Sequence, residues 1–137
     1  MNKRTSNAVW NGTGKEGSGH LTTASNVLSK TPYSWNSRFA EGSGTNPEEL
    51  MAAAHAGCFS MKLSFIIVAA GFVADTIETS STMTVDSGTI TDSQLVVKAK
   101  VPGISKEKFE ECANEAKLTC PVSKALKMNI TMQASLM

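Results

Sequence analysis

Residues 46–72, NPEELMAAAHAGCFSMKLSFIIVAAGF, constrain the fold most, because they predict one long helix that is apolar on nearly every side. Asn46 suits the N-cap, Pro47 suits the first helical position, and Gly71 is a natural stop. Apolar residues at spacings of three and four form one face, and others cover much of the rest. Such a helix must be enclosed on more than one side. In a chain of 137 residues, a second subunit is the obvious source of cover.

The same stretch is long enough to span a bilayer, but it carries His55, Lys62 and two serines, which are costly or neutral in lipid. We therefore expect no membrane span. The N-terminal sequence MNKRTSNAVWNGTGKEG lacks an apolar segment, so we also expect no signal peptide. Three cysteines, an odd number, do not suggest a secreted disulfide framework. These features predict a cytoplasmic protein whose cysteines serve packing, metal binding or redox chemistry.

Length and charge narrow the possible classes of function. A chain of 137 residues, 41% hydrophobic and 18% charged, fits one globular domain with one core. The net charge is +1, and the lysines and arginines are scattered rather than gathered into a stripe. Nucleic acid is therefore not favoured as a partner. Zinc is also disfavoured, because the sequence contains no C-x-x-C and no H-x-x-x-H pair.

The rest of the chain alternates between strand and helix signals. We expect strands in 7–12 and 19–28 around a Gly-rich loop, then a turn and a short extended piece that ends near Arg38. Residues 76–101 predict two strands around the turn DSG, 105–118 an amphipathic helix, 119–127 a helical turn and 128–133 a last strand. The prediction is a single α+β domain over residues 1–137.

The three cysteines differ in their surroundings. Cys112 lies on the apolar stripe of an ordinary helix, where a free cysteine behaves as a small hydrophobe. Cys120 precedes Pro121 at the start of a helical turn, a position that fits a structural thiol and a reactive one equally well. The position of Cys58 on the apolar face of the long helix, taken alone, indicates a core residue. A reactive thiol there would need a nearby cation, since apolar burial raises a thiol pKa.

Two cations could serve Cys58. Arg38 precedes the long helix, and Lys62 lies four residues after the cysteine on roughly the same face. Each also has an ordinary interpretation: Lys62 as a side chain whose ammonium reaches the surface, and Arg38 as a surface strand residue. Glu48 and Glu49 suit the start of a helix, and one of them could hold a guanidinium in a bidentate pair.

The segment RFAEGSGTNPEELMAAAHAGCFSM, with CPVSKAL 62 residues after the first cysteine, resembles the OsmC branch of the OsmC/Ohr thiol peroxidases (osmotically inducible protein C and organic hydroperoxide resistance proteins). The order of strands and helices fits from end to end. The resemblance gives Cys58 the peroxidatic position and Cys120 the resolving position. Arg38 matches the arginine of the RF element, and Glu48 matches the glutamate that orients it. Lys62 departs from the small apolar residue expected there.

The resemblance implies an OsmC-like fold, with antiparallel sheets around a long central helix, in an intertwined homodimer whose active sites lie at the subunit interface. The family works without metal, flavin or haem. The expected activity is reduction of organic hydroperoxides, followed by reduction of the protein by a dithiol, with lipoyl-type dithiols indicated. Phe39, Met51 and Phe59 are expected as walls of an apolar pocket. The alternative is a non-catalytic ligand-binding or redox-sensing dimer on the same scaffold.

Overall fold

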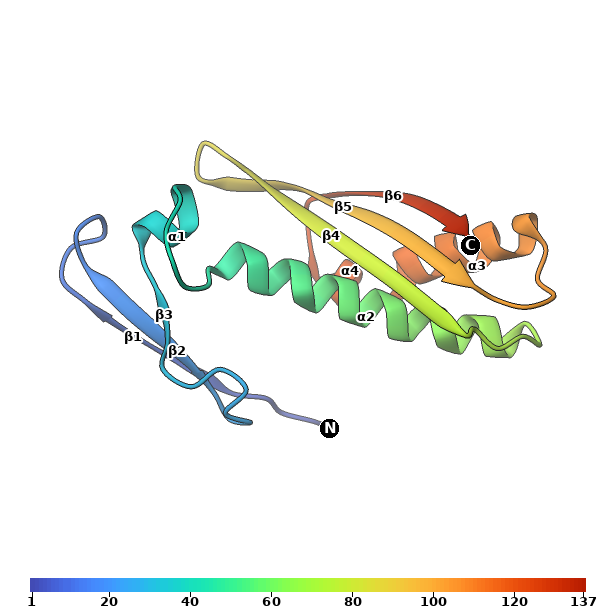
Figure 1. The fold of residues 1–137 in the computed structure, drawn as a ribbon, viewed down its shortest axis with the longest axis horizontal. Coiled ribbons are helices and arrows are strands. Elements are labelled where there is room, and N and C mark those ends of the chain that lie inside the picture. The colour runs from blue at the N-terminus through green and yellow to red at the C-terminus, as the bar shows by residue number, and fades with distance from the viewer. The chain divides into compact units, whose positions relative to one another are not determined.

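The structure is a computed structural model that describes all residues 1–137. Figure 1 shows the element order along the chain, with three strands, two helices, two strands, two helices and a final strand. The chain divides into two compact units, residues 1–50 and residues 51–137. Each unit has its own three-stranded sheet, with orders β1-β2-β3 and β4-β5-β6.

The first unit contains β1 (Ser6–Asn11), β2 (Ser18–Thr23), β3 (Thr31–Tyr33) and the short helix α1 (Trp35–Phe39). The three strands are antiparallel, as the hairpin signals predicted for the first two. The extended piece predicted to end near Arg38 is wrong, because Arg38 lies in α1. A capping box explains the helix: Ser37 N–H donates to Ser34 Oγ at 3.2 Å, and Ser34 N–H donates to Ser37 Oγ at 2.8 Å.

The long helix α2 (Pro47–Ala69) is continuous and has the predicted ends. Asn46 Oδ1 accepts a hydrogen bond from the backbone N–H of Glu49 at 2.7 Å, which satisfies one free donor of the first turn. Gly71 follows the helix with φ of +93°, a conformation that glycine adopts without steric cost. Glu48 therefore lies in the first turn of α2 and Cys58 near its middle.

The second unit contains β4 (Thr76–Asp86), β5 (Thr89–Lys100), α3 (Lys106–Thr119), α4 (Pro121–Ala125) and β6 (Asn129–Leu136). Strands β4 and β5 form the predicted hairpin, with positive φ at both turn residues, Ser87 and Gly88. Strand β6 pairs with β5 in parallel, so the expectation of purely antiparallel sheets is wrong for this pair. The chain between β5 and β6 passes through α3 and α4, a helical crossover that parallel neighbours require.

One hydrophobic core joins α2, the second sheet and α3. Alternate residues of β5 point into it, and the predicted stripe of α3 is buried against them. Its fully or nearly fully buried members are Phe59, Leu63, Ile66, Ile67, Leu95, Val97, Ala99, Val101, Phe109, Cys112, Ala113, Ala116 and Cys120. The burial of apolar surface in this core is the main force that holds α2, β5 and α3 together.

Another face of α2 remains uncovered within one chain. Met61, Phe65 and Val68 are 64%, 65% and 58% exposed. The helix is long and apolar enough to cross a membrane by length and composition alone, a test that core helices of soluble proteins also pass.

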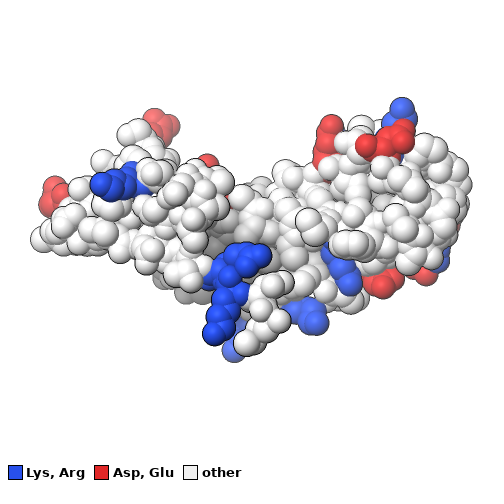
Figure 2. Space-filling view, turned by 90° about the horizontal axis from the view of Figure 1, so that it is seen from below, with Lys and Arg blue, Asp and Glu red and all other residues white.

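Charged side chains are spread over the surface. On the side of the molecule shown in Figure 2, lysines, arginines and carboxylates are scattered with wide uncharged areas between them, and no continuous charged stripe is visible.

Candidate functional site

Arg38 and Glu48 form a two-point ion pair within the first unit. Arg38 Nε donates to Glu48 Oε2 at 3.3 Å, and Nη2 donates to Oε1 at 2.5 Å. The hydrogen bond from Arg38 lowers the pKa of the Glu48 carboxyl, and the same bond raises the pKa of Arg38. The Glu48 side chain is 11% exposed and that of Arg38 is 37% exposed. The carboxylate thus fixes the direction of a guanidinium that solvent still reaches.

Aromatic rings surround this guanidinium. Arg38 lines a pocket of about 250 Å³ together with Trp10, Tyr33, Trp35 and Phe39. The Phe39 ring centre lies 4.8 Å from the central carbon of the guanidinium, within the range of a cation–π contact. The pocket combines a directed cation with apolar walls. Such a pocket can hold a molecule with one polar end and one apolar end.

Cys58 and Cys120 meet within the second unit. Cys58 is half-buried on α2 and packs against the core that contains Cys120. Burial is the main reason that the pKa of the Cys58 thiol is raised. The backbone N–H of Val122 opposes this shift, whereas hydrogen bonding and charge interaction with Cys120 add to it. Cys58 therefore packs beside the core that holds a second interacting thiol, and no cation is among the groups that shift its pKa.

Cys120 is held at the junction of two helices. It ends α3 and is also the N-cap of α4, with Pro121 at the first position of the new helix. Its sulfur accepts the backbone N–H of Ser123 at 3.3 Å and lies 3.2 Å from Ser123 Oγ. The side chain is 0% exposed, and all three cysteines of the chain are free thiols. The sulfur is thus fixed in position by local hydrogen bonds.

His55 is a polar residue of this region that the sequence analysis noted in the long helix but did not name as a site residue. It is fully buried on α2, one turn before Cys58. Its Nε2 lies 2.8 Å from Ser123 Oγ, and its Nδ1 lies 2.6 Å from Ser93 Oγ on β5. Burial lowers the pKa of His55, which favours the neutral imidazole. In the sequence, His55 precedes Cys58 by three positions, and Cys120 precedes Ser123 by three positions. Residues at this spacing are neighbours on a helix surface, which is the sequence signal that could have pointed to His55 and Ser123.

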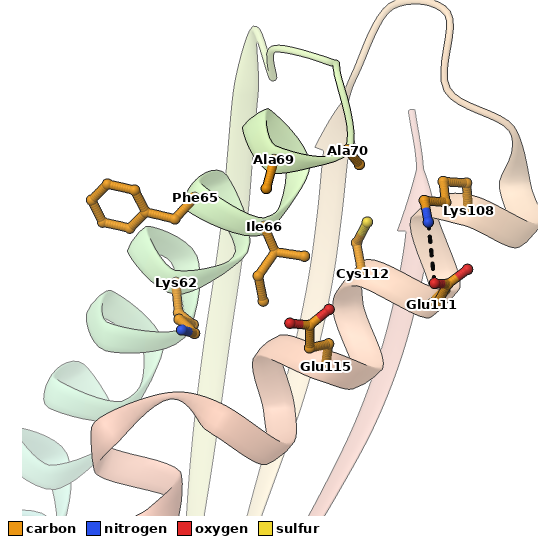
Figure 3. Close-up of a pocket in the computed structure, with 9 residues that line it drawn as sticks. All are labelled: Lys62, Phe65, Ile66, Ala69, Ala70, Lys108, Glu111, Cys112 and Glu115. Carbon is orange, nitrogen blue, oxygen red and sulfur yellow. Dashed lines mark hydrogen bonds and ion pairs between the residues drawn. The ribbon is translucent and has the colours of Figure 1, made fainter.

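Cys112 and Lys62 belong to a different place in the second unit. Both line a surface pocket of about 380 Å³ between α2 and α3, drawn in Figure 3. Burial is the main cause that raises the pKa of the Cys112 thiol, in keeping with its interpretation as a packing residue. Lys62 is not among the groups that shift the pKa of Cys58. The expectation that Phe59 walls a substrate pocket is wrong, because Phe59 is fully buried in the core.

The predicted site residues therefore form two pairs, Arg38 with Glu48 and Cys58 with Cys120. The first pair belongs to residues 1–50 and the second to residues 51–137. No group of three or more histidine, cysteine or acidic side chains is arranged to hold a metal ion. The arrangement supplies two adjacent thiols and a separately oriented cation, the functional groups that thiol redox chemistry uses.

Residues 40–135 match the protein family described as OsmC-like protein. The chain belongs to the OsmC-like family. It is 44% identical over 133 residues to peroxiredoxin OsmC of Escherichia coli K12, an alignment that covers 94% of this chain and 93% of the relative. The crystal structure of the organic hydroperoxide resistance protein OhrB of Bacillus subtilis matches with a TM-score of 0.68 and 29% identity, over 97% of this chain and 98% of that one.

A second solved structure supports the OsmC-like fold alone. The OsmC-like protein from Mycoplasma pneumoniae matches with a TM-score of 0.77 at 14% identity, over 98% of this chain and 97% of that chain. The α+β architecture, with its two sheets and long α2, is therefore that of the OsmC and Ohr proteins. The family assignment made from the two cysteine motifs is confirmed.

Proposed function

We propose that this protein is a peroxidase, a thiol-dependent reductase of organic hydroperoxides, in which Cys58 attacks the peroxide and Cys120 resolves the product. The observation that carries the proposal is that Cys58 packs against the core that contains Cys120, in a chain that is 44% identical to a peroxiredoxin. The relative from Bacillus subtilis is named for organic hydroperoxide resistance. The whole chain, residues 1–137, acts as one OsmC-like domain.

The first chemical step makes a sulfenic acid. The Cys58 thiolate attacks the terminal oxygen of the peroxide, the O–O bond breaks, and the alkoxide leaves and takes up a proton to become an alcohol. Sulfur is oxidised and the peroxide is reduced. Arg38 serves this step twice, first as the counter-ion of the thiolate and then as a hydrogen-bond donor to the developing alkoxide. Glu48 fixes the guanidinium in the required direction.

The second step protects the sulfur from further oxidation. The Cys120 thiolate attacks the Cys58 sulfenic acid, a disulfide forms, and hydroxide leaves as water. An external dithiol then reduces the disulfide by exchange and returns both thiols. A lipoyl-type dithiol is the reductant proposed from the family resemblance.

The active protein is proposed to be a cytoplasmic homodimer in which one subunit supplies the cation to the other. Two observations support this arrangement. The pKa of Cys58 is raised and no cation is among the groups that shift it, so stabilising the thiolate calls for a positive charge from elsewhere. The exposed apolar face of α2 formed by Met61, Phe65 and Val68 provides a surface that a second copy can cover.

The preference for organic peroxides is attributed to the aromatic pocket beside Arg38. An alkyl or aryl group can pack against Trp10, Tyr33 and Trp35, while the peroxide oxygens lie toward the guanidinium. Hydrogen peroxide has no apolar group to place in this pocket. It therefore gains no binding energy there.

The test is consumption of cumene hydroperoxide or tert-butyl hydroperoxide with dihydrolipoic acid as reductant. The wild type should turn over, and Cys58→Ser should be inactive. Wild-type protein that binds these peroxides without consuming them would instead support a binding or redox-sensing function. A rate with hydrogen peroxide equal to that with cumene hydroperoxide would contradict the substrate preference.

A further inference from the structure

In the proposed function, Cys120 attacks the Cys58 sulfenic acid, but the group that accepts the Cys120 thiol proton is not assigned. Its thiol must lose a proton before the sulfur can attack the sulfenic acid of Cys58, because the thiolate is the nucleophile. However, the Cys120 side chain is 0% exposed, so bulk water does not receive the proton directly. A buried resolving thiol of this kind needs a proton acceptor within the protein.

A continuous line of hydrogen-bonding side chains leads away from the Cys120 sulfur. Ser123 Oγ lies 3.2 Å from the sulfur, and His55 Nε2 lies 2.8 Å from Ser123 Oγ. On the other side of the imidazole, Ser93 Oγ lies 2.6 Å from Nδ1, and Ser81 Oγ lies 3.1 Å from Ser93 Oγ. Four of these five residues are buried, whereas Ser81 on β4 is half-buried. The line therefore connects an enclosed thiol with the edge of the core.

The line can carry a proton because each member can both donate and accept. In one arrangement the Cys120 S–H donates to Ser123 Oγ, the Ser123 O–H donates to His55 Nε2, and Nδ1–H donates to Ser93 Oγ. In the reversed arrangement His55 Nε2–H donates to Ser123 Oγ, and the Ser123 O–H donates to the Cys120 thiolate. Both arrangements keep the hydrogen bonds from Cys120 to His55 intact. The backbone N–H of Ser123 also donates to the sulfur and holds it in place at 3.3 Å.

We propose, on the basis of the proposed function, that His55 is a positioning and proton-accepting residue for the resolving step. Ser123 connects His55 to Cys120. The Cys120 proton passes to Ser123 Oγ while the Ser123 proton passes to His55 Nε2. The freed thiolate then forms the S–S bond with Cys58 as the S–O bond of the sulfenic acid breaks. The departing hydroxide takes up one proton and leaves as water, so the net reaction consumes and releases no other species.

Ser93 and Ser81 explain how a buried imidazole can accept a proton. A positive imidazolium is disfavoured in the core, as the lowered pKa of His55 indicates. When Nε2 accepts a proton, Nδ1 can release its own proton to Ser93 Oγ, and Ser93 can pass one on toward Ser81. The imidazole then returns to its neutral form with the opposite nitrogen protonated. His55 thus acts as a relay, and it need not hold the charge.

The test separates the two chemical steps in a single turnover without reductant. Cumene hydroperoxide is mixed with excess protein, the Cys58 sulfenic acid is followed by trapping with dimedone, and the disulfide is followed by loss of the Cys120 thiol, measured by peptide mapping. Three variants test the line: His55→Gln, Ser123→Ala and Ser93→Ala. Glutamine can keep hydrogen bonds to both serines, but it cannot relay a proton. Ser60→Ala is the matched control, because Ser60 is an α2 serine that bonds to Thr79 on β4 outside the line.

The sulfenic acid should form at the wild-type rate in all four variants. Disulfide formation should slow by roughly a hundredfold in His55→Gln and Ser123→Ala, since general base catalysis contributes a factor of that order. Ser93→Ala should slow it by a smaller factor, and Ser60→Ala should not change it. The slow variants should also accumulate Cys58 sulfinic acid when the peroxide is in excess.

Two outcomes in the variants would overturn the role of His55, and both can be told apart from a result that overturns the proposed function. Wild-type disulfide formation in His55→Gln would mean that His55 serves only as a hydrogen-bonding residue. An unchanged rate in Ser123→Ala would show that the thiol proton leaves by another route. If the wild type itself formed no sulfenic acid at Cys58, the proposed function would fail. A variant that failed to fold would lose the first step as well, and the remaining variants would then decide.

Discussion

The guanidinium of Arg38 on α1 is held at two points by the carboxylate of Glu48, which lies ten positions further on in the first turn of α2. Two adjacent helices thus present one oriented cation. The Glu48 carboxylate is the less exposed partner, and its charge is stabilised by this bond. The pair therefore stabilises the first unit as well as directing a cation, and the two roles can be measured separately.

The stabilising role predicts a pH dependence. Because the pKa of Glu48 is lower in the folded protein than in the unfolded chain, its ionised form adds stability above the ordinary glutamate pKa. That stability is lost as the pH falls through the lowered value. Glu48→Gln should therefore unfold more readily than the wild type at neutral pH, and the difference should vanish in acid. Urea unfolding at a series of pH values measures this. A difference that does not change with pH would contradict it.

The thiol pairing predicts a specific disulfide. One equivalent of cumene hydroperoxide should join Cys58 and Cys120 within one chain and leave Cys112 free. Cys120→Ser should permit one oxidation and then stop as a sulfenic or sulfinic acid at Cys58. Peptide mapping of the oxidised protein provides the measurement. Finding Cys112 in the bond, or no bond after oxidation, would exclude the two-cysteine mechanism.

Cys112 should be dispensable for catalysis but not entirely for stability. Cys112→Ala removes a buried sulfur from the stripe of α3, where 2% of the residue is exposed. The expected loss is about 1 kcal/mol in the free energy of unfolding, the order of one buried methylene group. Peroxide turnover should stay at the wild-type rate. A large loss of turnover in a stably folded variant would show that Cys112 has a chemical role.

Lys62 should have little influence on the nucleophile. It lines the pocket between α2 and α3, and it is not among the groups that shift the pKa of Cys58. Lys62→Ala should therefore leave the Cys58 thiol pKa almost unchanged. Alkylation by iodoacetamide as a function of pH measures this pKa, with Cys58→Ser as the blank. A clear rise in the pKa would assign Lys62 a second electrostatic role.

The proposed shared site predicts complementation between two inactive variants. In the continuous helix α2, Glu48 and Cys58 are ten residues apart, or about 15 Å along the axis, so antiparallel helices of two subunits can place them side by side. Glu48→Ala mixed with Cys58→Ser under subunit exchange should recover up to about a quarter of wild-type activity. Random pairing makes half the dimers mixed, and half of their sites are complete. No recovery despite proven exchange would place the site within one chain.

Much of the fold was predictable because its signals are local. The ends of α2 follow from Asn46 and Gly71, and the β4–β5 hairpin follows from alternation around a short turn. The candidate site residues were named from the family motifs, and in the structure Arg38 and Glu48 are hydrogen-bonded to each other. The helix α1 was missed because its five residues are too few to show a period. Only the reciprocal bonds of Ser34 and Ser37 reveal it.

The sequence by itself determined the helix caps, the strand alternation, the packing role of Cys112 and the family. Each of these is encoded by spacings of a few residues or by a long specific motif. The tertiary structure alone decided that β6 lies parallel to β5, and that His55 connects to Ser93 and Ser123, 38 and 68 positions away. Contacts over such separations depend on how the sheet and helices pack, and no local periodicity records that packing.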